Sequence, residues 1–117
     1  MLKLEDSQSS WRSLSFQAIG YYCGYLDTEQ ELKIQTSLFN YFLHYPKEYM
    51  YQVSKIDLVK SDCFLNLFSN YVQYYLQNGE VTIISMKNVA FKYCVDCSDS
   101  DISSIYQYLE LASKYEK

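Results

Sequence analysis

The stretch SDCFLNLFSNYVQYYLQNG, residues 61–79, limits the possible folds of this chain more than any other part of the sequence. Large apolar side chains recur in it every three or four residues, the spacing of one face of an α-helix. Ser61 or Asp62 is suited to cap the start of this helix, and Asn78-Gly79 is a typical stop signal. The stretch therefore predicts a helix with one buried face, formed by Phe64, Leu67, Phe68, Tyr71 and Tyr75.

Three other segments repeat the helical spacing. Apolar side chains at intervals of three and four predict helices over residues 10–26, 29–44 and 100–115. The second of these helices has a start signal in Thr28, which is followed three residues later by Glu31, the pattern of a capping box. Most of the chain is therefore expected to be helical.

Two segments differ from this pattern. Residues 81–86 and 89–95 are rich in β-branched and aromatic side chains, and the two-residue link Lys87-Asn88 separates them. These features predict a β-hairpin. Residues 47–60 fit both a helical face and a strand-like alternation, and we favour a short helix followed by an extended tail.

Length and composition predict one folded unit. A chain of 117 residues with 49% hydrophobic residues is large enough to bury a core as a single domain, 1–117, in which 1–9 form a flexible polar lead. The predicted class is α+β and predominantly helical, with about four helices and the hairpin placed before the last of them. The longest nearly apolar run, 18–26, is too short to span a bilayer, and the first residues lack the apolar stretch of an export signal.

The segment YCVDCSDSD holds a CxxC pair, Cys94 and Cys97. A redox dithiol gains reactivity from a helix N-terminus, but the helix is predicted to begin after both thiols. The surrounding carboxylates of Asp96, Asp99 and Asp101 raise a thiol pKa. A zinc site needs a second close pair of ligands, which the sequence lacks. We therefore predict that all four cysteines are reduced thiols in the cytoplasm, with no metal and no cofactor, and keep a redox function as an alternative.

Tyrosine is unusually frequent, with 14 among 117 residues. This number exceeds what a core of this size requires, and the phenolic hydroxyl favours positions that reach water. Exposed tyrosines are frequent anchors in protein interfaces. The enrichment therefore indicates either an interaction surface or an aromatic-rich core, and the sequence alone leaves both open.

Acidic side chains are segregated near the C-terminus. Residues 93–111 hold four acids and no lysine or arginine, whereas the rest of the chain has ten acids and ten bases. A segregated acidic surface repels nucleic acid phosphates and attracts basic proteins. The predicted partner-binding residues are Asp96, Asp99, Asp101, Tyr108 and Glu110.

The sequence contains no motif of a nucleophile with its base or of a phosphate-binding loop, so we do not expect an enzyme. As a class, a small acidic tyrosine-rich chain resembles the immunity and anti-defence proteins that bacteria and phages make against basic proteins. The expected function is inhibition of a basic toxin or nuclease-like partner by occlusion, without direct contact to nucleic acid or membrane. The alternatives are a CxxC redox protein and a self-associating adaptor, and the oligomeric state is left open.

Overall fold

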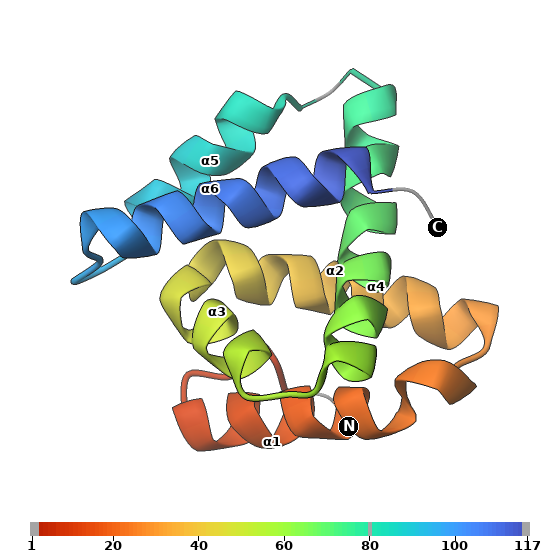
Figure 1. Ribbon diagram of the computed structural model, residues 1–117. Coiled ribbons are helices and arrows are strands. Elements are labelled where there is room, and N and C mark those ends of the chain that lie inside the picture. The colour runs from red at the N-terminus through yellow and green to blue at the C-terminus, as the bar shows by residue number, and fades with distance from the viewer. Residues whose placement is uncertain (1–2, 80, 116–117) are drawn as a thin grey trace.

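The computed structural model describes residues 3–79 and 81–115 and consists of packed helices (Figure 1). In chain order the elements are α1 (Ser9–Tyr22), a short 3-10 helix η1 (Cys23–Tyr25), α2 (Thr28–His44), α3 (Pro46–Ser54), α4 (Leu58–Gln77), α5 (Ile83–Lys92) and α6 (Asp99–Lys114). The described residues include no β-strand. None of the helices among them is both long enough and apolar enough to cross a bilayer.

Helix α4 runs crosswise to α1, α2 and α6 and packs against all three (Figure 1). Its buried side carries Phe64 and Phe68, as the sequence predicts, and the chain leaves the helix at Asn78-Gly79, where Gly79 has a φ of 72°. At the start of the helix, neither of the predicted N-cap residues, Ser61 and Asp62, is the cap. The helix begins at Leu58, because the side chain of Asp57 accepts a hydrogen bond from the backbone N–H of Lys60 and so caps an earlier turn.

The core is built largely from aromatic rings. Phe16 of α1 stacks on Phe64 of α4 with ring centroids 4.1 Å apart. Gly20 favours this close crossing, because a Cβ atom at that position would lie 3.3 Å from the Phe64 ring and would require it to shift by a few tenths of an ångström. Phe68 lies at the centre and contacts further rings from α2, α3 and α6, namely Phe39, Phe42, Tyr49 and Tyr108.

The three other predicted helices are confirmed, with small changes at their ends. Helix 10–26 becomes α1 and η1, helix 29–44 is α2, and helix 100–115 is α6. The capping box of α2 lies one residue earlier than predicted, between Asp27 and Gln30. For 47–60, α3 confirms the favoured short helix. The extended tail is wrong, because a turn leads directly into α4.

The predicted hairpin is wrong, and so is the α+β class, because this region forms the helix α5. Thr82 caps it through a reciprocal capping box with Ser85, and Lys87-Asn88 lies in the middle of the helix. The side chains of Met86 and Ala90, one turn apart, are buried in the helix α5, which packs on α6 and α2. Packing against a neighbouring helix outweighs β-propensity here, since an isolated two-stranded hairpin is marginally stable in water.

Candidate functional site

The predicted partner-binding residues are only partly brought together. Asp96, Asp99 and Asp101 lie at the link between α5 and α6, residues 93–98, and in the first turn of α6. Glu110 lies about three turns further along α6. The fifth predicted residue, Tyr108, is buried.

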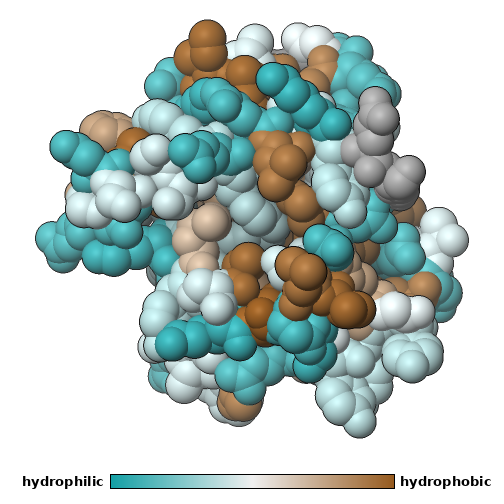
Figure 2. Space-filling view, viewed as in Figure 1, coloured by the Kyte–Doolittle hydropathy of each residue, from teal (hydrophilic) through white to brown (hydrophobic). Residues whose placement is uncertain are grey.

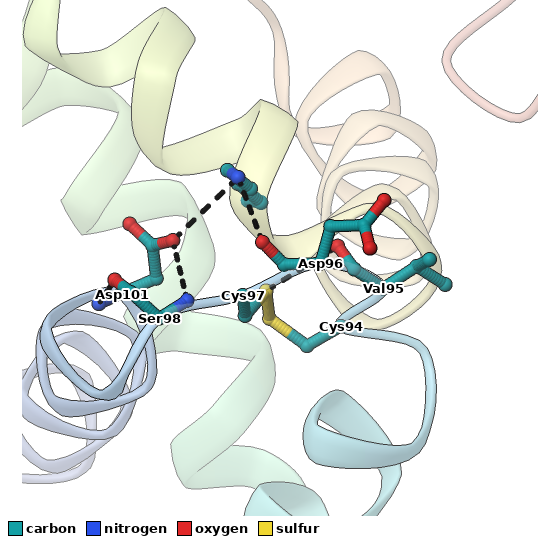
Figure 3. Close-up of a disulfide and its surroundings, with 7 residues drawn as sticks. Cys94, Val95, Asp96, Cys97, Ser98 and Asp101 are labelled. Carbon is teal, nitrogen blue, oxygen red and sulfur yellow. Dashed lines mark hydrogen bonds and ion pairs between the residues drawn. A yellow bond between two sulfur atoms is a disulfide. The ribbon is translucent and has the colours of Figure 1, made fainter.

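A disulfide between Cys94 and Cys97 closes the link between the two helices (Figure 3). Within this turn Asp96 has a φ of 57°, a left-handed conformation that Asp and Asn adopt more readily than most residues. The Nζ atom of Lys47, on α3, donates a hydrogen bond of 3.0 Å to the Asp96 carbonyl. The link is therefore fixed both within itself and to the rest of the fold.

Asp101 is engaged inside the protein. Its carboxylate accepts a hydrogen bond from the backbone N–H of Ser98, while the Ser98 hydroxyl accepts one from the Asp101 N–H, and together these form the capping box of α6. The Ser98 N–H bond and the nearby Lys47 ammonium hold the pKa of Asp101 below its usual value. Lys47 lies 3.6 Å from this carboxylate, so part of the predicted acidity is neutralised from α3.

Two further carboxylates are Asp96, within the link, and Asp99, the first residue of α6. Among the described residues, neither Asp96 nor Asp99 takes part in an ion pair. In Figure 3 the side chains of Asp96 and Asp101 lie on opposite sides of the disulfide. The link also exposes two large hydrophobic side chains, Tyr93 at 40% and Val95 at 74%. We call the surface of Tyr93, Val95, Asp96 and Asp99 the acidic corner.

Tyr108 belongs to the core. Its exposed fraction is 8%, and its hydroxyl shares a 2.7 Å hydrogen bond with the hydroxyl of Tyr49, which is fully buried. Burial raises the pKa of both phenols. Both therefore stay neutral over the physiological range, and Tyr108 is not accessible to a partner in this structure.

Glu110 is paired with Lys87 of α5. The same ammonium lies 5.4 Å from the ring centroid of Tyr106, one helical turn before Glu110. The hydrogen bond from Lys87 holds the pKa of Glu110 below its usual value. This ion pair connects α5 and α6, and it removes Glu110 from the unpaired acidic surface.

A groove of about 870 Å³ lies beside the acidic corner, between the α5–α6 link, the start of α3 and the N-terminal lead. In Figure 1 the link projects at the left of the view, beyond α3. We call this hollow the link groove. It is lined by Glu5, His44, Tyr45, Pro46, Lys47, Glu48, Tyr51, Tyr93 and Val95.

The wall of the link groove contains a partly buried ion pair, in which the side chains of Arg12 and Glu48 are 7% and 25% exposed. Arg12 of α1 donates two hydrogen bonds, of 2.8 and 2.9 Å, to the carboxylate of Glu48 on α3, and its guanidinium lies 3.7 Å from the ring centroid of Tyr45. The hydroxyl of Tyr41 donates a 2.6 Å hydrogen bond to the same carboxylate. Burial raises the pKa of Glu48, but the hydrogen bonds from Arg12 and Tyr41 outweigh it and leave the pKa below its usual value.

Sequence reasoning missed this network. Arg12 is the single charged residue within α1, and it lies on the side of that helix that packs into the protein, where it is 6% exposed. An arginine isolated in an otherwise uncharged helix was the available signal. Its partner, Glu48, lies 36 residues away, and helical spacing gives no information about contacts at that distance.

The prediction of four reduced cysteines is wrong in this structure, where Cys23 is bonded to Cys63 and Cys94 to Cys97. The first disulfide joins η1 to α4 across 40 residues, a pairing that local sequence patterns do not reveal. No group of three His, Cys, Asp or Glu side chains suited to a metal ion occurs in residues 3–79 and 81–115.

The tyrosines divide between the core and the surface. Tyr41, Tyr49 and Tyr108 are buried, and six others are exposed by 40% or more: Tyr21, Tyr22, Tyr25, Tyr51, Tyr74 and Tyr93. A second groove, of about 630 Å³, lies between α1, η1 and α2 and includes two of the exposed rings. Figure 2 shows that apolar side chains also reach the surface in the middle of the face in view, between α6 and α1.

No protein-family model, curated protein or solved structure matched this chain when the three were compared with it. The site is therefore interpreted from its geometry alone. That geometry combines a fixed acidic corner with an adjoining aromatic groove, an arrangement suited to binding a positively charged surface.

Proposed function

We propose that this protein is a small inhibitor of the immunity or antitoxin type, which binds a basic partner protein and blocks its working site by occlusion. The proposal rests mainly on the acidic corner, where Asp96 and Asp99 form no ion pair among the described residues and lie within six residues of the exposed Tyr93 and Val95 along the chain. Carboxylates beside apolar anchors match a surface rich in lysine and arginine.

Rigidity supports the same proposal. The link is held by the Cys94–Cys97 disulfide, by Lys47, and by the capping box that Ser98 and Asp101 form. A surface that is already ordered loses less conformational entropy when it binds, so more of the contact energy appears as affinity. The corner is therefore suited to tight binding without prior folding of a loop.

The proposed contact set differs from the predicted one. Asp96 and Asp99 keep their role, and Tyr93 replaces Tyr108 as the aromatic anchor because Tyr108 is buried. Asp101 and Glu110, each paired with a lysine, contribute less to the field that a partner meets. A toxin or nuclease-like partner fits because its phosphate-binding site offers the required lysines and arginines, whereas nucleic acid itself is repelled by this surface.

The test is affinity capture from the native host with wild-type protein and with the Asp96→Asn, Asp99→Asn double variant. Asparagine removes both charges and still tolerates the left-handed backbone at position 96. We expect the wild type to retain a basic protein and suppress its activity, and the variant to retain at least tenfold less.

The matched control is Glu29→Gln with Asp62→Asn, which changes the net charge equally at two exposed positions remote in sequence from the corner. We expect this control to capture as much partner as the wild type. Equal loss with both double variants would mean that net charge alone directs binding, and the acidic corner would then have no special role.

The compartment is a separate part of the proposal. Cysteines in the cytoplasm are normally kept reduced, whereas disulfides such as the two in this structure are typical of an oxidising compartment. Occlusion of a basic partner works in either place. Trapping of free thiols in intact host cells distinguishes them, since reduced cysteines indicate the cytoplasm and protected ones an oxidising compartment.

A thiol–disulfide exchange protein is the second candidate, and the Cys94–Cys97 disulfide favours it. Against it, α6 begins after both sulfur atoms, and Asp96 and Asp99 lie close in sequence, so nearby charge disfavours a thiolate. If exchange were the function, the wild type would accelerate reduction of a protein disulfide by dithiothreitol and the Cys94→Ser, Cys97→Ser variant would not. We expect no acceleration by either protein.

A further inference from the structure

The link groove contains an internal example of how this protein holds a guanidinium group. The Arg12 side chain lies over the ring of Tyr45 at 3.7 Å from its centroid and donates two hydrogen bonds to Glu48. Both of these partner residues line the groove. An aromatic face combined with a carboxylate is a favourable environment for a planar cation.

The open part of the groove offers the same kinds of group, although the Tyr93 ring also packs edge-to-face on His44, with centroids 4.7 Å apart. Tyr51 is 60% exposed and Tyr93 is 40% exposed, so both rings offer area to a ligand. Glu5 also lines the groove, is exposed, and takes part in no ion pair among the described residues. Two aromatic rings and a free carboxylate therefore face one hollow.

None of the lysines near the groove is paired with Glu5 among the described residues. The ammonium group of Lys47, the one lysine in the lining, is bonded to the Asp96 carbonyl and paired with Asp101. Lys55 and Lys92 lie 5.0 and 5.6 Å from the ring centroids of Tyr51 and Tyr93, respectively, and neither lysine lines the groove. Both rings thus already attract cations, whereas Glu5 pairs with none within residues 3–79 and 81–115.

We propose that the link groove binds an arginine side chain of the basic partner, packed on Tyr51 and Tyr93 with its guanidinium bonded to Glu5. This inference rests on the proposed function and names the partner group that enters beside the acidic corner. Arginine fits better than lysine, because its planar guanidinium stacks on rings and bonds a carboxylate through two N–H groups at once.

The test uses two blocked peptides, glycine-glycine-arginine-glycine-glycine and the same sequence with citrulline, the uncharged isostere, in place of arginine. Binding is followed by NMR chemical shifts of the full-length protein. We expect the arginine peptide to shift the resonances of Glu5, Tyr51 and Tyr93 and the citrulline peptide to leave them unchanged. Shifts that are equal for both peptides, or that are confined to Asp96 and Asp99, would overturn the proposal.

Variants then assign the contacts. Tyr51→Ala with Tyr93→Ala should weaken binding of the arginine peptide about tenfold, or about 1.4 kcal/mol, and Glu5→Gln should weaken it severalfold. Tyr74→Ala is the control, because Tyr74 is 61% exposed and does not line the groove. An equal effect of Tyr74→Ala, or no effect of the groove variants, contradicts the assignment.

The outcomes separate this inference from the proposed function. If the arginine peptide misses the groove while host capture still depends on Asp96 and Asp99, the guanidinium site is wrong and the inhibitor proposal stands. If the peptide binds as expected but capture does not depend on the corner, the site stands and the inhibitor proposal is wrong.

Discussion

Replacing Glu48 with alanine is expected to lower the free energy of unfolding by about 3 kcal/mol. Glu48 accepts both hydrogen bonds of the Arg12 pair and one from Tyr41. Its removal leaves the guanidinium of Arg12, whose side chain is 7% exposed, without a counter-ion. Urea unfolding at neutral pH measures the loss.

The control for this prediction is Glu29→Ala. It breaks the pair of Glu29 with Lys33, in which both side chains are more than three-quarters exposed, so the loss should stay below about 1 kcal/mol. Equal losses in the two variants would show that the Arg12–Glu48 pair is worth no more than an exposed surface pair. Replacing Arg12 and Glu48 together by methionine should recover part of the stability, because no uncompensated charge then remains.

The stability difference between wild type and Glu48→Ala should also depend on pH. The folded-state pKa of Glu48 lies below its usual value, so its contribution is complete above the unfolded value of about 4.3 and is lost as pH falls through the folded value. The difference in unfolding free energy should therefore be constant from neutral pH down to about pH 5 and shrink in more acidic solution. A difference that grew with acid would reverse the sign that the network requires.

Removing the Cys23–Cys63 disulfide is the second large effect that we expect. The Cys23→Ala, Cys63→Ala variant should lose about 4 kcal/mol on the chain-entropy estimate, because the crosslink closes a loop of 40 residues. Dithiothreitol should lower the stability of the wild type and leave that of a variant without cysteines unchanged. Denaturant unfolding with and without reductant measures both.

The Cys94→Ala, Cys97→Ala variant provides the comparison. Its disulfide spans a separation of only three residues, so the same estimate gives a loss of about 2 kcal/mol. The expected order is therefore a larger loss for the pair that joins η1 to α4. The reverse order would show that the short link, and not the long loop, dominates stability.

The helices that the sequence predicts correctly are those whose buried residues recur at helical spacing. Helix α4 has one continuous apolar face and a clear stop at Asn78-Gly79, so its course was predictable although its cap at Asp57 was not. In α5 the local signals conflicted. Ile84 and Phe91 have strong β-propensity but are exposed, while the smaller Ala90 is buried against the fold, and only the packing reveals this.

The site was less predictable than the fold for a related reason. Asp96, Asp99 and Asp101 are close in sequence and remain close in space. Their electrostatic environment depends on Lys47, 49 residues before Asp96, which no local pattern brings to the link. Tyr108 was misplaced because its helical position relative to Ile105 and Leu109 fits the buried face as well as an exposed edge.

The most direct test of the account is the association rate of the purified protein with its captured partner, measured by stopped flow at several salt concentrations. If the partner binds through the acidic corner, the wild-type rate falls steeply with salt. The rate for Asp96→Asn, Asp99→Asn is then at least tenfold slower at low salt and nearly independent of salt. The Glu29→Gln, Asp62→Asn control should follow the wild type. Identical rates and salt dependence for wild type and corner variant, with both proteins folded, would contradict the claim that the acidic corner is the binding surface.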